Sequence, residues 1–375
     1  MVKIFVVHGM GKHIEGWWTG DNGTQKKLEG LKRFDSLKGS SNTLESLIGA
    51  IDWKEVVYDD ASERIRTAPE QEGHFDKLIA DISGNSNSTV SATDLNNWKT
   101  SSLSLSSSLN LFNRTDFTKN NVWDVFLCAN KLTRHYLALH IAEQILSEIK
   151  NNPDEPWGIL AHSLGTALIQ DALNLLYDLI GKNDFKTPPR VVGLIANFSR
   201  TKIGDILVSQ NPASSDTAVW PSRSAKTSMC NYYISARHKL DPLSYLGDEM
   251  PDPWNIEPDG FTRSCYRVFE HKDLNFVPQE IDINNPVEVG SFNHSVENYF
   301  AHPKIHLPFL YRALGMGTLV TSSIEDEATK AFLKTRQPTA INFAQVIAQS
   351  DLSSLEAWIE ALAKIGKNFN VGADT

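Results

Sequence analysis

The sequence predicts an α/β fold: a mostly parallel sheet of about six strands flanked by helices, with insertions and a helical C-terminal region. The first observation is the run Val2–Val7, whose nearly continuous apolar character is typical of a strand buried on both faces of a parallel sheet. The second is the segment from Trp157 to Leu168, which has the pattern of a short apolar strand, a tight turn with one serine, and a helix. The third is a series of short apolar segments spaced as successive βα units require.

Taken in chain order, the remaining elements follow from their periodicity. Further strands are expected at Lys54–Tyr58, Val191–Ala196, Tyr232–Ala236 and Tyr266–Glu270. A long helix is expected within Val125–Ile149, because Leu137, Ile141, Ile145 and Ile149 share one face, and another after Gly165, where Leu168, Ala172, Leu175, Leu176 and Leu179 recur at helical spacing. Shorter helices are expected at Val296–Phe300, Ile305–Met316, Ile324–Thr335 and Ser353–Ile365.

Length and composition allow two average domains or one elaborated α/β domain, and the motifs described below, which span Ile4 to His294, favour one. The chain has 375 residues, of which 41% are hydrophobic and 22% charged, enough to bury a substantial core. We expect one domain over residues 1–320, with a helical appendage at 321–375 packed on it. Residues 83–118 are rich in Ser and Asn but carry interleaved apolar residues, which favours a hairpin or lid over a solvated linker.

The serine turn carries the strongest chemical signal. Ser163 stands in Ala161-His162-Ser163-Leu164-Gly165, with small residues two positions before and after it, as a crowded strand-to-helix turn requires. A serine hydroxyl is a weak nucleophile unless a base and oriented amide dipoles support it, and such a turn exposes the hydroxyl to both. The alternative is a structural turn in which the serine caps the helix.

The amino-terminal strand ends in His8-Gly9-Met10-Gly11. With the serine turn, this motif resembles the α/β-hydrolase fold, and compact bacterial lipases share both the Ala-His-Ser sequence and a start near the His-Gly strand. The resemblance implies an oxyanion hole made by the backbone N–H groups of Met10 and Leu164. A simple tight loop or a phosphate-binding turn is the alternative, although Lys12-His13 does not fit a nucleotide loop.

The resemblance also places the acid of a catalytic triad on a loop after a strand downstream of the serine. Asp241, which precedes Pro242 just after the expected strand Tyr232–Ala236, occupies that place. A buried carboxylate there would hold the imidazole in its working tautomer. Asp248 and Asp252 are alternatives, and an ordinary Asp-Pro turn is the structural interpretation.

The base is expected last in chain order. We assign it to His294, which lies in a short polar loop just before an expected helix. His302 and His306 fall in a Pro-flanked loop, where either would hydrogen-bond a backbone carbonyl, and His271 is a further alternative.

The resemblance implies a serine hydrolase that cleaves carboxylic esters, esterase-like or lipase-like, through an acyl-enzyme. Its substrate would be a small-molecule or lipid ester, and Trp17 and Trp18 after the first turn are expected to bind it, with core packing as the alternative. An amidase or thioesterase would use the same triad. An inactive binding protein on a hydrolase scaffold is the third possibility.

Charge and composition exclude several other classes. The net charge of −9 argues against a nucleic-acid partner. No apolar run reaches bilayer-spanning length and no signal peptide is recognisable, so cytoplasmic residence is expected, with export without a cleaved signal as the alternative. His135 and His140 lack metal-site spacing, and Cys128, Cys230 and Cys265 lack paired short spacing. We therefore expect no cofactor, no catalytic metal, and buried thiols.

Overall fold

The computed structural model of the chain describes residues 1–9, 13, 15–21, 23–25, 44–62, 131–180, 188–197, 230–236, 266–269, 277–278, 294, 296–316, 330 and 336–337. The insertion at 83–118 and nearly all of the segment 321–375 lie outside these residues, so the lid and the helical appendage stay predictions.

One parallel sheet forms the centre of the molecule. Its strands are β1 (Val2–Val7), β2 (Ile51–Val56), β3 (Trp157–His162), β4 (Val192–Ile195), β5 (Tyr233–Ala236) and β6 (Tyr266–Phe269). They lie in the order β2-β1-β3-β4-β5-β6, and every neighbouring pair is parallel. This arrangement, with helices on both sides, confirms the α/β class.

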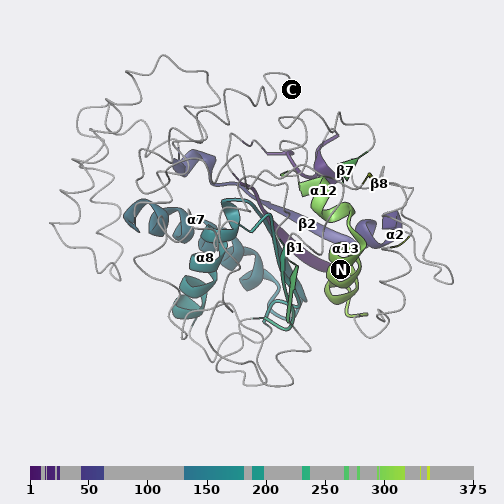
Figure 1. The fold of residues 1–375 in the computed structure, drawn as a ribbon. Coiled ribbons are helices and arrows are strands. Elements are labelled where there is room, and N and C mark those ends of the chain that lie inside the picture. The colour runs from purple at the N-terminus through teal and green to yellow at the C-terminus, as the bar shows by residue number, and fades with distance from the viewer. Residues whose placement is uncertain are drawn as a thin grey trace, which may run out of the picture.

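Helices cover both faces of the sheet (Figure 1). On one face α7 (Lys131–Asn151) packs against α8 (Gly165–Ile180). On the other lie α2 (Leu44–Gly49), α12 (Val296–Ala301) and α13 (Pro303–Ala313). Among the helices in the described part of the chain, none combines the length and apolar character needed to cross a bilayer.

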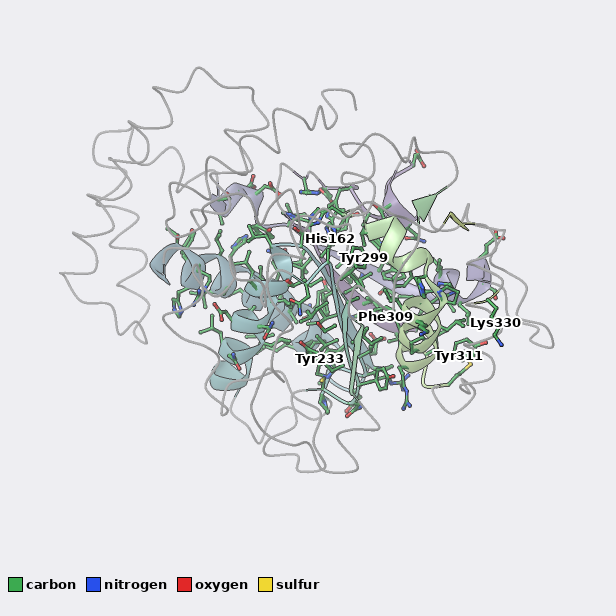
Figure 2. All side chains as sticks on the ribbon, viewed as in Figure 1. His162, Tyr233, Tyr299, Phe309, Tyr311 and Lys330 are labelled. Atoms are coloured by element: carbon green, nitrogen blue, oxygen red, sulfur yellow. The ribbon has the colours of Figure 1, made fainter. Side chains whose placement is uncertain are left out.

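Burial explains why β1 is apolar throughout. All six of its residues are buried, as expected for a strand covered on both faces. On the side of α13, Ile4 and Val6 belong to a core cluster with Phe309. The ring of Phe309 lies directly on Gly193 of β4, where an added Cβ would come within 2.9 Å of two ring carbons (Figure 2). A glycine in this strand therefore makes room for the helix.

The opposite face is closed by α7 and α8. Leu137, Ile141 and Ile145 are fully buried, which confirms the apolar face predicted for α7. The two helices are also joined by an ion pair in which Arg134 Nε lies 2.6 Å from Asp171 Oδ2. Burial raises the pKa of the Asp171 carboxyl above its ordinary value, while Arg134 acts in the opposite direction.

The starts of β2 and α13 differ from the sequence prediction. Strand β2 begins at Ile51 and ends at Val56, earlier than the expected Lys54–Tyr58, because Ile51 and Trp53 alternate into the core. Helix α13 begins at Pro303, so His302 is its N-cap and His306 lies inside the helix. The loop expected around these histidines is correct for His302, which precedes the helix, and wrong for His306; proline at a first helical turn is pre-organised to start a helix rather than to prevent one.

A short antiparallel pair was not predicted. It joins β7 (Val277–Pro278) to β8 (Arg336–Gln337). Strand β8 lies within 321–375, where only helix was expected. Two residues per strand give too little alternation for a sequence pattern to be recognisable.

The strand order reverses direction at one place. From β1 the chain passes to β2 on one side, and from β2 it crosses back over β1 to β3 on the other side. Loops that follow β1 and β3 therefore leave the same edge of the sheet in opposite directions. In open α/β sheets, ligands bind at such a switch point, outside the carboxyl ends of the strands. His8 and Gly9 follow β1 there, and Ser163 follows β3.

Candidate active site

Ser163 occupies a strained corner between β3 and α8. Its φ is +53°, in the left-handed region that side chains other than glycine seldom adopt. The corner is held by three hydrogen bonds: Ser163 N donates to Ile195 O at 3.0 Å, and Ser163 O accepts from Thr166 N at 2.9 Å and Thr166 Oγ1 at 2.6 Å. A strained strand-to-helix turn carrying a serine is the geometry that the sequence motif predicted.

Two glycines let the turn after β1 approach this corner. A Cβ on Gly9 would lie 2.6 Å from Ser163 Cβ and 3.1 Å from Ser163 Oγ. A Cβ on Gly165 would lie 2.2 Å from the carbonyl oxygen of His8. The shortest distance at each glycine, 2.6 Å at Gly9 and 2.2 Å at Gly165, is shorter than a Cβ atom tolerates, so the two turns can approach this closely only because both positions are glycine. The small residue two positions after the serine is thus required by the neighbouring strand.

Gly165→Ala is expected to separate these two turns. Because the obstructing atom is a backbone oxygen, relief requires a shift of α8 or of His8, and we expect the free energy of unfolding to fall by roughly 1–3 kcal/mol. Gly49→Ala is the matched control, since nothing lies within 4 Å of the added Cβ there. Urea denaturation monitored by tryptophan fluorescence checks both. Equal unfolding midpoints for the two variants would contradict the close approach.

His294 contacts Ser163, although the two residues are far apart in the chain. Its Nε2 lies 2.8 Å from Ser163 Oγ, a hydrogen-bonding distance between residues 131 positions apart. A second contact fixes the backbone of the same residue, because Nε2 of His162 donates to the carbonyl oxygen of His294 at 2.6 Å. The structure therefore brings the two side chains predicted as nucleophile and base into the geometry that their roles require.

The other histidines proposed as bases are engaged elsewhere. Nδ1 of His306 lies 2.9 Å from the carbonyl oxygen of Phe300, and Nδ1 of His302 accepts from Lys304 N as the cap of α13. Both rings are buried. His302 and His306 thus have structural contacts within the α12–α13 region.

Several predicted site residues lie outside the described residues. These are Met10, Asp241 and the alternatives Asp248, Asp252 and His271. Leu164, the other predicted oxyanion donor, is described: it is buried and lies between the serine and the first residue of α8. The triad acid and one oxyanion donor therefore stay predictions.

The loop after the first turn is organised by Glu55 of β2. Its carboxylate accepts hydrogen bonds from Gly16 N at 2.6 Å, Trp18 N at 2.9 Å, Thr19 N at 2.6 Å and Thr19 Oγ1 at 2.8 Å. The Glu55 carboxylate is a charged acceptor. By accepting from three backbone N–H groups it fixes the conformation of a loop that lies outside the sheet. No local pattern in the sequence indicates this role for Glu55.

The two tryptophans on that loop have different surroundings. Trp18 is fully buried and packs on Trp53 with ring centroids 5.1 Å apart, so core packing is its role. Trp17 is half-buried, edge-on to His8 at 5.8 Å. Substrate contact by Trp17 stays a prediction.

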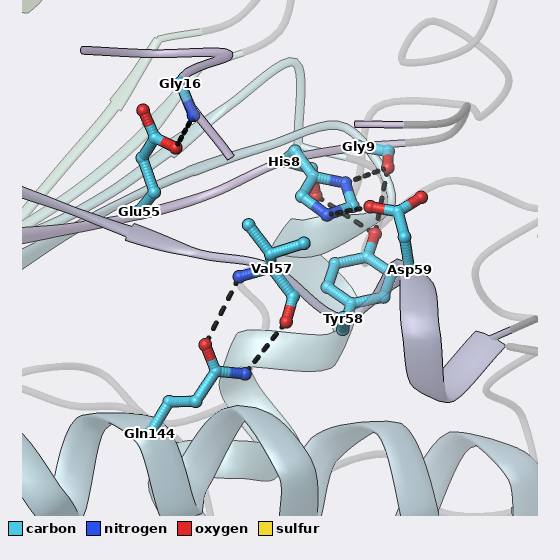
Figure 3. A network of polar contacts seen from close by, with 8 residues as sticks. All are labelled: His8, Gly9, Gly16, Glu55, Val57, Tyr58, Asp59 and Gln144. Carbon is cyan, nitrogen blue, oxygen red and sulfur yellow. Dashed lines mark hydrogen bonds and ion pairs between the residues drawn. The ribbon is translucent and has the colours of Figure 1, made fainter. Parts of the chain in front are cut away.

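Sequence reasoning missed Tyr58 and Asp59, which surround the turn after β1 (Figure 3). The Tyr58 hydroxyl donates to the carbonyl oxygens of His8 at 3.1 Å and of Gly9 at 2.9 Å. Asp59 Oδ2 lies 3.0 Å from His8 Nε2. The available signal was positional: the two residues are the second and third after β2, beside β1 at the carboxyl edge of the sheet.

Within the described residues, one group could hold a metal ion: His8, His13 and Asp59, whose ligand atoms lie within 4.8 Å of one another. The rings of His8 and His13 are stacked, with centroids 4.2 Å apart and planes 24° from parallel. An imidazole binds a metal through a nitrogen lone pair in the plane of its ring, so two stacked rings cannot both reach one ion unless one turns. The arrangement fits aromatic stacking beside a carboxylate better than a metal centre.

Comparisons of the chain with protein-family models, with curated proteins and with solved structures gave no match. A functional assignment therefore depends on the chemistry of the site itself.

Proposed function

We propose that this protein is a serine hydrolase of the α/β-hydrolase fold that cleaves carboxylic esters. One observation carries the proposal: Ser163 Oγ, on a corner with φ of +53°, lies 2.8 Å from His294 Nε2. A nucleophile within hydrogen-bond reach of a base, at the carboxyl edge of a parallel sheet and at its switch point, has the arrangement that acyl transfer requires.

The proposed reaction follows the arrangement of these groups. His294 Nε2 accepts the proton of Ser163 as its oxygen attacks the ester carbonyl, and the tetrahedral oxyanion is stabilised by the N–H groups of Leu164 and Met10. The imidazolium then protonates the leaving alcohol. Water, activated by the same imidazole, releases the carboxylic acid and restores the serine. In this scheme Asp241 stabilises the imidazolium through Nδ1.

Several features beyond the dyad support the hydrolase fold. The sheet order, the helices on both faces and the serine at the β3–α8 turn agree with it. The close approach of Gly9 to Ser163 supports an oxyanion turn after β1. Esters of small molecules or lipids are the proposed substrates, and residence in the cytoplasm is the proposed location.

Labelling with a fluorophosphonate probe tests the proposal, because the probe forms a covalent adduct only with an activated serine. We expect one adduct, on the peptide that contains Ser163, and none in Ser163→Ala. Heat-denatured protein is the control for non-specific labelling. A folded chain that takes up no probe would favour the alternative of an inactive binding protein. For an active chain, matched ester, thioester and amide substrates of one acyl group distinguish esterase from thioesterase and amidase.

A further inference from the structure

The carbonyl oxygen of Gly9 is held by two side chains (Figure 3). It accepts from the Tyr58 hydroxyl at 2.9 Å, and His8 Nδ1 lies at the same distance, 2.9 Å. The same hydroxyl also lies 3.1 Å from the carbonyl oxygen of His8, so two successive carbonyls converge on one donor. Without that hydrogen, two buried carbonyl oxygens would face each other, and the turn would be expected to change its conformation.

We propose that Tyr58, assisted by His8, is a positioning residue that aims the oxyanion-hole N–H of Met10 by fixing the Gly9 carbonyl; this inference rests on the proposed function. Gly9 C=O and Met10 N–H belong to one peptide group, which is planar, and in a trans peptide the two bonds point in opposite directions. Anchoring the carbonyl therefore fixes the direction of the N–H by covalent geometry alone. Hydrogen bonds to the carbonyl also polarise the peptide and strengthen its N–H as a donor.

The position of this peptide relative to the nucleophile agrees with that role. Gly9 is so close to Ser163 that an added Cβ would lie 3.1 Å from Ser163 Oγ. The Gly9–Met10 peptide thus begins beside the hydroxyl that attacks the substrate. An N–H in this place is useful only if it points at the developing oxyanion, because a hydrogen bond weakens steeply as its angle departs from linearity.

Tyr58 is itself held rigidly. Its ring is buried and stacks on the ring of His8 with centroids 4.0 Å apart and planes 13° from parallel. The preceding residue, Val57, is clamped by Gln144 of α7, whose side-chain amide donates to Val57 O at 2.9 Å and accepts from Val57 N at 3.3 Å (Figure 3). Asp59 Oδ2 lies 3.0 Å from Nε2 of the His8 ring. The hydroxyl therefore has little freedom to follow a displaced carbonyl.

Strand register explains why these residues meet. In the parallel pairing of β1 with β2, Val7 lies opposite Val56, so both strands end at the same level. The residues that follow, His8 and Gly9 on one strand and Val57 and Tyr58 on the other, are therefore neighbours at the sheet edge. Tyr58 is thus set beside the oxyanion turn by the sheet itself.

Tyr58→Phe tests the inference, because it removes the hydroxyl and keeps the ring that stacks on His8. Loss of a whole oxyanion donor costs about 10²–10³ in kcat, so misalignment of one is expected to lower kcat by roughly 10- to 100-fold with KM little changed. Rates are expressed per site titrated with fluorophosphonate, which corrects for any unfolded fraction. Tyr311→Phe, in buried α13, is the matched control and is expected to retain the parental kcat.

A second measurement separates positioning from general loosening of the fold. Affinity for a trifluoromethyl ketone, whose serine adduct carries an oxyanion, is expected to fall in Tyr58→Phe by the same factor as kcat/KM. Two variants at position 8 test the contact of His8 Nδ1 with the Gly9 carbonyl. In His8→Asn the side-chain amide N–H lies near the position that Nδ1 has in histidine, whereas in His8→Gln it lies nearer the position of Nε2. We expect the Asn variant to be the more active of the two, and this comparison decides the inference if Tyr58→Phe does not fold.

The results also separate this inference from the proposed function. If the parental chain takes up no probe and hydrolyses no ester, the proposed function fails. If the parental chain does both, an unchanged kcat and ketone affinity in Tyr58→Phe would overturn the role of Tyr58 alone. Equal activity of His8→Gln and His8→Asn would overturn the assisting role of His8.

Discussion

Ser163→Ala is expected to abolish ester hydrolysis, with kcat lowered by roughly four to six orders of magnitude, as when the nucleophile of a serine triad is removed. The reason is chemical: without Oγ there is no acyl-enzyme, and the remaining oxyanion donors can assist only a direct attack by water. The fold should survive, because Ser163 holds its corner through backbone N and O, which alanine retains. Hydrolysis of p-nitrophenyl esters of graded acyl length, with thermal unfolding in parallel, checks both expectations.

Ser46→Ala provides the matched control for this variant. Ser46 lies on the exposed surface of α2, so the same chemical change there should leave kcat at the parental value. Turnover at the parental rate by purified Ser163→Ala would reject Ser163 as the nucleophile. Adduct formation at another serine would then point to the residue that replaces it.

His294→Ala is expected to lower kcat by a similar factor of roughly four to six orders of magnitude, because nucleophile and base act as a unit. The 2.8 Å contact from Nε2 to Ser163 Oγ is the route by which the proton leaves the serine. His294→Gln retains a polar group near the serine but supplies no base, and it should be nearly as inactive. Combining either with Ser163→Ala should add almost nothing to the loss.

His302→Ala and His306→Ala are the controls that distinguish the base from its neighbours. His306→Ala removes the hydrogen bond to Phe300 O, and His302→Ala removes the one accepted from Lys304 N. Because both rings are buried, each variant should lower the free energy of unfolding by about 1–3 kcal/mol. We expect kcat per titrated site to stay near the parental value in both. If one of these variants, rather than His294→Ala, lost activity per titrated site, the base would have to be reassigned.

The parts of the fold and site that sequence could predict are those encoded locally. Strand β1 was recognisable because its burial on both faces demands apolar residues throughout. The serine corner was recognisable because close contact with the neighbouring strand demands glycine at 165. The pairing of Ser163 with His294 was expected from chain order, and the structure brings the two together.

The contacts that the sequence could not predict join residues that are distant in the chain and become neighbours only in the sheet. The contact of Tyr58 with the Gly9 carbonyl follows from the register of β1 with β2, which no local pattern encodes. The carboxylate of Glu55 reaches a loop 36 to 39 positions away in the chain for the same reason. His306 was placed in a loop because prolines on either side suggested a break, whereas Pro303 starts helix α13.

The hydrogen bond from His162 Nε2 to the backbone of His294 has a consequence for operation across pH. An imidazole that donates through Nε2 keeps that hydrogen when it gains a second proton at Nδ1, so its hold on the carbonyl is available in both charge states. In the proposed reaction His294 exchanges a proton in every catalytic cycle. The hydrogen bond from His162 to its backbone carbonyl need not break when the pH falls.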